Sequence, residues 1–291
     1  MCISPLTIKR DYNRLASEVE AGYNTNTDIV PCGKCHECLG VRRNSWAFRL
    51  WKQMDVSDSA YFITLTYADE PLTKNGHGTL KKTDLQRFWK RLRKRSPGRR
   101  IKYYACGEYG GLYKRPHYHA IVYNIPQSLA LDSENFAKSI WTHGQVDIAP
   151  ANMPTIFYTV GYIMKGSWEP QHEIDTDTGL ITCEDDRVPE YSTMSKNLGL
   201  NYLSEAIWNW HVDTMSSFVT MQNGSLMAMP RYYREKVFSR EERKELAAEA
   251  RFIRNLNWQE FANIDYNREH DKKVASVRKH KKEQQLKRMK L

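Results

Sequence analysis

The sequence predicts an α+β fold, because stretches typical of strands and of helices alternate along its middle. Residues 61–67, YFITLTY, are rich in β-branched and aromatic side chains. Residues 101–106 and 117–123 have the same character and are joined by a glycine-rich turn, which favours a hairpin. With 291 residues, of which 41% are hydrophobic, the chain can bury the core of one large domain or two modest ones.

Two helices are predicted from the spacing of large apolar residues. The first covers residues 42–54, where one face carries apolar side chains four residues apart: Trp46, Leu50 and Met54. The second begins at a capping box formed by Thr83 and Gln86. Its apolar residues recur at helical spacing: Leu85, Phe88, Trp89 and Leu92.

The remaining segments are assigned more briefly. Residues 1–30 are expected to be irregular, 133–142 helical, 145–148 a short strand and 155–165 helical. Residues 166–195 hold eight acidic residues and one basic residue, which indicates a loop or small insertion. The tail from residue 239 is expected to be helical. Its last part, 269–291, has nine Lys and Arg against three acids and is expected to be a solvated helix or disordered.

The charge favours a polyanionic partner. Net charge is +10 and the pI is about 9.2, so nucleic acid is the first expectation and an anionic membrane surface the weaker one. The sequence shows no apolar run near 18 residues and no secretory signal, so no membrane span is expected. Residues 81–102 carry eleven Lys and Arg and one acid. Their basic side chains are either contacts to a DNA backbone or a solvated charged face: Lys81, Lys82, Arg87, Lys90, Arg91, Arg93, Lys94 and Arg95.

Three cysteines crowd into one short segment. Cys32, Cys35 and Cys38 have C-x2-C-x2-C spacing, which fits three ligands of a structural zinc ion. Cys2 or His36 would supply the fourth ligand, and Cys2 is preferred because His36 lies inside the short loop. The alternatives are an iron–sulfur cluster and free cysteines in a turn.

A second group of metal-binding residue types lies in the hairpin. His117 and His119 alternate along one strand, so both imidazoles point to the same face. Glu108 falls near the turn of the same hairpin and could swing in as a third ligand. Imidazole and carboxylate together suit a divalent cation, Mn²⁺ or Mg²⁺. Three protein ligands leave open positions for a substrate oxygen. The alternative is two ordinary strand histidines and a surface glutamate.

A third feature is the helix predicted over residues 155–165. At about 100° per residue, Tyr158, Tyr162 and Lys165 fall on one face, and the aliphatic side chains of residues 156, 160 and 163 fall on the opposite face. A tyrosine hydroxyl is a poor nucleophile near its ordinary pKa of about 10, and a nearby lysine and a metal-polarised phosphate would activate it. The alternative is an amphipathic helix with two surface tyrosines.

Taken together, H-hydrophobe-H on a strand, then Y-x-x-x-Y-x-x-K on a helix, resembles the HUH endonucleases. These enzymes include rolling-circle replication initiators, relaxases and some transposases. The upstream FITLT, residues 62–66, resembles the first motif of the family, and the three motifs have its order. Within this superfamily, VPCGKCHECLGVRRNSWAFR, CGEYG…RPHYHAIV, WTHGQVDI and YTVGYIMKG are similar to the replication initiators of gokushovirus-type microviruses, which are small single-stranded DNA phages. The similarity covers roughly residues 1–205.

The resemblance implies a fold and a set of roles. It implies an antiparallel sheet with a ferredoxin-like core, flanked by helices, with the histidines on a central strand and the polar face of the tyrosine helix turned toward them. Residues 1–45 would form a Cys-rich segment, 46–215 the nicking and joining domain, and 216–291 a helical, basic extension. The metal ligands would be His117, His119 and Glu108. Tyr162 and Tyr158 would be nucleophiles, with Lys165 at the scissile phosphate. Gly161 departs from the pattern, since related two-tyrosine initiators are expected to have lysine there.

The implied activity is replication initiation. A tyrosine would attack single-stranded or extruded origin DNA, link itself to the 5′ phosphate and release a 3′-OH primer for a host polymerase, working with a host helicase in the bacterial cytoplasm. A second tyrosine would cut the regenerated origin and allow the strand to be rejoined. The alternative function is a non-catalytic, zinc-containing nucleic-acid-binding protein, which would have no need of the tyrosine–lysine face.

Overall fold

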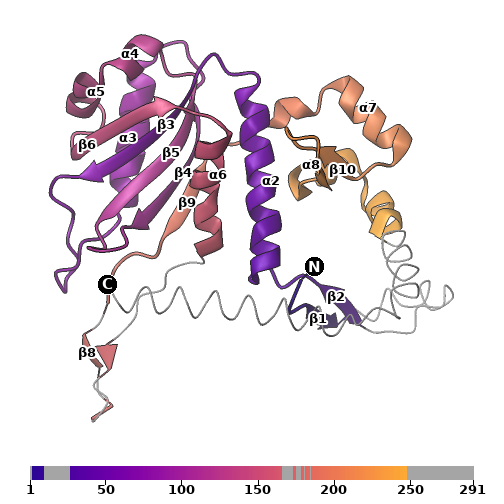
Figure 1. Cartoon of the computed structure of the whole chain (residues 1–291), viewed down its shortest axis with the longest axis horizontal. Helices are drawn as coiled ribbons and strands as arrows, with labels where there is room; N and C mark the ends of the chain where they lie inside the picture. The colour runs from indigo at the N-terminus through magenta and orange to yellow at the C-terminus, as the bar shows by residue number, and fades with distance from the viewer. Residues whose placement is uncertain are drawn as a thin grey trace.

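The centre of the computed structural model, which describes residues 2–9, 27–165, 173, 174, 178, 179, 181–183 and 185–247, is a five-stranded antiparallel sheet (Figure 1). Its strands are β3 (Ala60–Tyr67), β4 (Lys102–Tyr109), β5 (Pro116–Tyr123), β6 (Gly144–Pro150) and β9 (Tyr191–Met194). They lie in the order β6-β3-β5-β4-β9, so β5 is the middle strand. The predicted α+β class, with an antiparallel sheet and flanking helices, is therefore confirmed, and so is the central position of the histidine strand.

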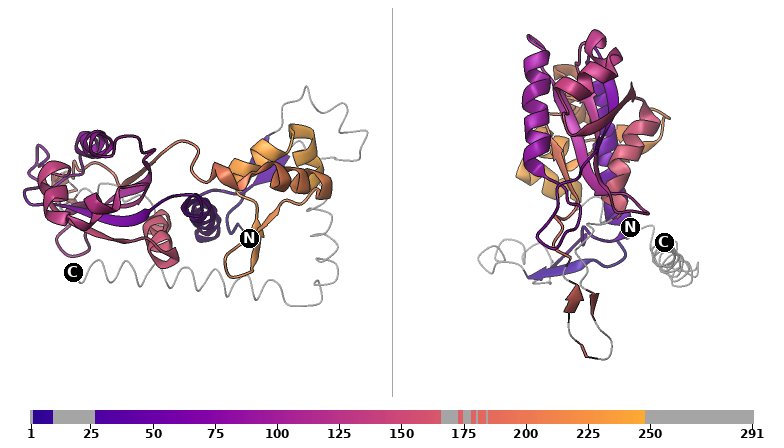
Figure 2. Two further views of the ribbon diagram at one scale, coloured as in Figure 1. Left: turned by 90° about the horizontal axis from the view of Figure 1, so that it is seen from above. Right: turned by 90° about the vertical axis from the view of Figure 1, so that its left-hand side faces the viewer.

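Helices cover both faces of this sheet (Figure 2). One face packs on α3 (Lys82–Arg95), and the other packs on α2 (His36–Met54) and α6 (Met153–Gly161). Alternation along β5 divides its side chains between the two cores. Tyr118, Ala120 and Val122 lie in the core under α3, while Ile121 and Tyr123 lie in the core under α2 and α6. His117 and His119 share the register of this second set and therefore belong to the α6 face.

The helix α2 lies between the sheet and a C-terminal group of elements (Figure 1). That group comprises η3 (Leu200–Tyr202), α7 (Glu205–Thr214), β10 (Phe218–Thr220), β11 (Leu226–Ala228) and α8 (Arg231–Val237). Phe48 of α2 packs with Tyr233 and Val219 from this group. The sequence analysis assigned no element to residues 205–237, and this part of the fold was missed.

The smaller elements complete the description. They are β1 (Leu6–Lys9), β2 (Thr27–Val30), α4 (Gln127–Leu131), α5 (Ser133–Ser139), η2 (Tyr162–Lys165), β7 (Glu173–Ile174) and β8 (Ile181–Cys183). β1 and β2 pair, so the N-terminal segment is more ordered than expected. Residues 240–247 are helical, as predicted for the start of the tail, whereas 269–291 lie outside the described residues. In the part of the chain that the structure describes, no helix is long and apolar enough to span a membrane.

Two sequence predictions about helix ends are wrong. The N-cap of α3 is Lys81, not Thr83, and no side chain caps it. The reason is tertiary: the backbone N–H of Lys81 donates to the Tyr118 hydroxyl at 2.9 Å, and the Lys81 carbonyl lies 3.1 Å from the same oxygen. This contact holds the backbone extended at Lys81 and starts the helix there. The α5 helix also ends earlier than the predicted residue 142.

The predicted helix over 155–165 is divided. The α-helical part, α6, begins at a capping box between Asn152 and Thr155 and ends at Gly161. The chain then continues as the 3-10 turn η2. Residues 166–195, expected to form a loop or small insertion, also supply β9, the edge strand next to β4. That pairing joins residues far apart in sequence, so no local pattern shows it.

Candidate active site

Strand register brings together the three predicted metal ligands. Glu108 lies opposite His117 in the β4–β5 ladder, and His119 follows two residues later on the same face. The Nε2 atoms of His117 and His119 lie 2.7 and 3.2 Å from the same Glu108 Oε1. One ligand atom from each residue lies within 4.8 Å of the others. Glu108 reaches this position as a residue inside a longer β4, not by swinging in from the turn as predicted.

Each imidazole is oriented by a hydrogen bond at its other nitrogen. His117 Nδ1 lies 3.0 Å from the Arg115 carbonyl oxygen, so Nδ1 carries the proton and donates. His119 Nδ1 lies 3.1 Å from the Thr64 hydroxyl. In both rings Nε2 is left facing Glu108. Second partners of this kind fix the ring and tautomer of metal-binding histidines.

Burial makes this cluster costly without a cation. The side chains of Glu108 and His119 are only 5% and 8% exposed. A buried carboxylate needs a compensating charge or several hydrogen bonds. Two Nε2 atoms and one carboxylate oxygen converging on one point are a suitable donor set for a divalent cation, so these residues fit the expected metal.

Tyr162 packs directly on this cluster. Its ring is stacked on the His119 ring, with centroids 5.5 Å apart and planes 7° from parallel. Phe62 is also stacked on His119, at 5.5 Å and 11°. Burial, together with hydrogen bonds to Glu108 and Tyr158, raises the pKa of the Tyr162 phenol far above its ordinary value. The tyrosine helix therefore faces the histidines, as expected.

Tyr158 is placed differently from Tyr162. Its ring meets the rings of His119 and Tyr162 edge-on, at 5.2 and 5.4 Å, and its side chain is 53% exposed. The predicted opposite face is buried, since Ile156 and Val160 are fully covered. Lys165 ends η2, and its side chain lies outside the described part of the chain. The division of the helix at Gly161 removes the 100° rule by which Lys165 was placed beside the tyrosines.

The four predicted cysteines also lie together. The sulfur atoms of Cys2, Cys32, Cys35 and Cys38 are within 4.8 Å of one another. The backbone N–H groups of Lys34 and Cys35 donate to the Cys32 sulfur at 3.4 and 3.3 Å and lower the pKa of that thiol. Cys2 is thus the fourth member of the group, and all four are partly exposed. Four converging sulfurs suit zinc or an iron–sulfur centre.

The basic helix lies away from this site. α3 packs on the opposite face of the sheet from His119 and the tyrosines. Several of its basic side chains point outward, whereas Arg91 donates to the Ile140 carbonyl and the Thr142 hydroxyl. A strand bound at both places would have to pass around an edge of the sheet.

Sequence reasoning missed the residues that support the ligands. Thr64 orients His119, Phe62 covers one of its faces, and the Arg115 carbonyl orients His117. A signal was present for the first two. In FITLT, Phe62 and Thr64 alternate onto one face, and a strand paired with the histidine strand would bring them beside it.

Known proteins share this arrangement of segments. A family model described as a replication-associated protein of the ORF2 type matches residues 60–167, a stretch that holds β3, α3, β4, β5 and α6. The chain is 27% identical over 252 residues to the replication-associated protein VP4 of Bdellovibrio phage phiMH2K, covering 75% of each chain.

Two further relatives are of the same kind. The replication-associated protein ORF2 of Spiroplasma virus 4 is 27% identical over 303 residues, covering 94% of this chain and 86% of the relative. The replication-associated protein ORF4 of Chlamydia phage 1 is 25% identical over 224 residues, covering 71% of this chain and 53% of the relative. No solved structure matches. The resemblance to phage replication initiators that the sequence predicted is confirmed by these relatives.

Proposed function

We propose that this chain initiates rolling-circle replication of a small phage genome by nicking single-stranded or extruded origin DNA through a tyrosine. The observation that carries the proposal is the stacking of Tyr162 on His119, with its hydroxyl hydrogen-bonded to Glu108. A nucleic-acid-binding protein without catalysis has no use for a tyrosine held against a buried His-His-Glu cluster. Relatives described as replication-associated proteins of phages support the same role.

His117, His119 and Glu108 would hold Mg²⁺ or Mn²⁺, as the convergence of their ligand atoms favours. Such a cation polarises a phosphate as a Lewis acid and offsets the charge that develops on its oxygens. Tyr162 then attacks the scissile phosphorus. A P–O bond to the phenolic oxygen forms, the P–O3′ bond breaks, the phenolic proton is lost, and the 3′ oxygen takes up a proton. The products are a 5′-phosphotyrosine and a 3′-OH that primes a host polymerase.

Tyr162 is assigned the first cut and Tyr158 the second. Tyr162 stacks on a ligand ring and contacts Glu108, whereas Tyr158 is half exposed one helical turn away. A second tyrosine can cut the regenerated origin while the first still holds the strand, and the ends are then rejoined. Lys165 remains assigned to the scissile phosphate. Residues 46–215 would carry this chemistry, with 1–45 and 216–291 as accessory parts, in the cytoplasm of a bacterial host.

Incubation of the protein with its single-stranded genome and Mn²⁺ tests this proposal. We expect a covalent protein–DNA adduct that is lost in the Tyr158→Phe/Tyr162→Phe protein, while binding of the DNA is kept. Tyr113→Phe is a matched control, because this tyrosine is 86% exposed and lies in the turn between β4 and β5. An adduct that persists in the double variant would contradict the proposal, and binding without any adduct in the unaltered protein would favour the non-catalytic alternative.

A further inference from the structure

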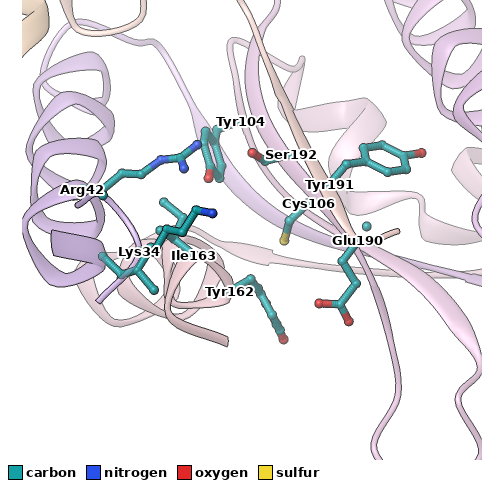
Figure 3. A pocket seen from close by; sticks show the side chains of 12 residues that line it. Lys34, Arg42, Tyr104, Cys106, Tyr162, Ile163, Glu190, Tyr191 and Ser192 are labelled. Carbon is teal, nitrogen blue, oxygen red and sulfur yellow. The ribbon is translucent and has the colours of Figure 1, made fainter. Parts of the chain in front are cut away.

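A cavity of about 560 Å³ opens beside Tyr162 (Figure 3). Three separate segments line it. Gly33, Lys34 and Arg42 come from the cysteine loop and the start of α2, Tyr162 comes from η2, and the edge of the sheet supplies residues of β4 and β9 such as Ser192. The metal ligands are not among the lining residues, so the cavity is a separate space that borders the nucleophile. It is large enough for a group well beyond a single phosphate.

Charge is distributed unevenly around this cavity. Lys34 and Arg42 lie together on the α2 wall, and Glu190 lies on the wall across from them (Figure 3). Among the described residues, no acidic group forms an ion pair with Lys34 or Arg42, and both are exposed. Glu190 already accepts a hydrogen bond from the backbone N–H of Tyr109 at 3.1 Å. An anion in the cavity is therefore drawn to the α2 wall.

The position of Lys34 depends on the cysteine cluster. Its backbone N–H donates to the Cys32 sulfur, and the Cys32 N–H in turn donates to the Cys2 sulfur at 3.2 Å. Arg42 follows on the first turns of α2, directly after the last cysteine of the loop. The cluster therefore holds both cations toward a tyrosine that lies more than a hundred residues later in the chain.

We propose that this cavity binds the nucleotide next to the scissile phosphate, with Lys34 and Arg42 contacting the backbone phosphates of the single strand. The proposal rests on the proposed function, because it is the need to bring a phosphate to Tyr162 that places the neighbouring nucleotide in this space. Ser192 and the Tyr104 hydroxyl add polar groups to the wall between the cations and the sheet. The cysteine cluster thereby acts as the support for a DNA contact.

Binding is measured apart from chemistry, in the Tyr158→Phe/Tyr162→Phe background, by fluorescence anisotropy. The probe is a fluorescein-labelled oligothymidylate of about 20 nucleotides. We expect Lys34→Ala/Arg42→Ala to weaken binding about tenfold and to reduce the salt slope by about 1.4, since each phosphate contact to a single strand contributes about 0.7. Lys74→Ala/Arg100→Ala removes the same charge from exposed loop positions outside the cavity and is expected to change affinity by no more than about twofold.

Equal losses in the two double variants, or no loss in either, would overturn the cavity assignment. With the tyrosines restored, Lys34→Ala/Arg42→Ala is expected to lower the adduct rate at low DNA concentration and to leave the rate at saturating DNA nearly unchanged. Failure of the proposed function gives another pattern, namely no adduct in the unaltered protein with Lys34- and Arg42-dependent binding intact. Lys34→Arg/Arg42→Lys should restore most of the affinity, because both positions keep their charge.

Discussion

The two clusters of metal-binding side chains in this protein are built in different ways. Glu108, His117 and His119 are held by paired strands in the middle of a sheet, and two of the three are buried. The four cysteines are partly exposed and come from a loop that closes on Cys2, thirty residues before Cys32. A cluster made by strand register keeps its geometry whether or not an ion is bound. A cluster made by loop closure depends on the ion to offset the entropy of closing the loop.

The largest difference between the clusters should appear in the chemistry. We expect His119→Gln to lower the rate of adduct formation about 100-fold or more, because it removes a ligand of the ion that polarises the phosphate. The melting temperature should change by only a few degrees, since Gln keeps a polar group of similar size in a place supported by the whole sheet. Single-turnover adduct formation and thermal melting measure the two effects.

A large loss of melting temperature in His119→Gln would show that the fold, and not only the chemistry, depends on this residue. His36→Gln is the matched control, because His36 is exposed at the start of α2 beside the other cluster. It should leave the adduct rate unchanged.

The second expected effect is the reverse pattern in the cysteine cluster. Cys35→Ser should abolish one equivalent of bound zinc and lower the melting temperature by about 5 °C or more, since structural metal sites contribute folding free energy. Adduct formation at saturating DNA should fall much less than in His119→Gln. Metal analysis of the purified protein, thermal melting and the adduct assay together check this.

Cys106→Ser serves as the control for cysteine loss. That residue is buried on β4 and is not a member of the cluster, so its replacement should leave the zinc content unchanged. Bound zinc in the Cys35→Ser protein at the level of the unaltered protein would contradict the four-sulfur site.

A third, smaller effect concerns the support of the His119 ring. Thr64→Val removes the hydroxyl that lies 3.1 Å from Nδ1 and keeps the shape of the side chain. We expect Mn²⁺ affinity to fall about 10- to 100-fold, as is usual when the second partner of a metal-binding histidine is lost. The measurement is the Mn²⁺ dependence of adduct formation, and Thr66→Val, on the same strand and face, is the control. Equal effects of the two substitutions would deny Thr64 a specific role.

The smallest effect is expected from the outer tyrosine. Tyr158→Phe should change the first cut by less than about threefold, because the hydroxyl of this half-exposed side chain is not the one held against Glu108. Rejoining of the strand should fail, since the second nucleophile is absent. Separate assays of nicking and of circular product on the same DNA measure the two steps.

The contrast between the clusters also explains what the sequence could predict. The two histidines were placed by the period of two in a strand, and Cys2 was preferred as the fourth sulfur. Ile156 and Val160 were assigned to the buried side of the tyrosine helix by its period, and the structure confirms this. Each of these predictions rests on a local repeat or a short spacing.

The features that were missed depend on contacts between distant segments. The start of α3 is set by the Tyr118 hydroxyl, which overrides the capping box at Thr83. β9 arises from an acidic stretch because it pairs with β4, and the cavity beside Tyr162 exists only where three distant segments meet. The change to 3-10 geometry after Gly161 removed the basis for placing Lys165.

The central claim is that Tyr162, held against the His-His-Glu cluster, makes the first covalent bond to DNA. The most direct measurement is mass spectrometry of the adduct after nuclease and protease digestion, which identifies the residue that carries the nucleotide. We expect the 5′-phosphate on Tyr162 in the unaltered protein and in Tyr158→Phe. A nucleotide carried by Tyr158 in the unaltered protein, or by any residue other than these two tyrosines, would contradict the account.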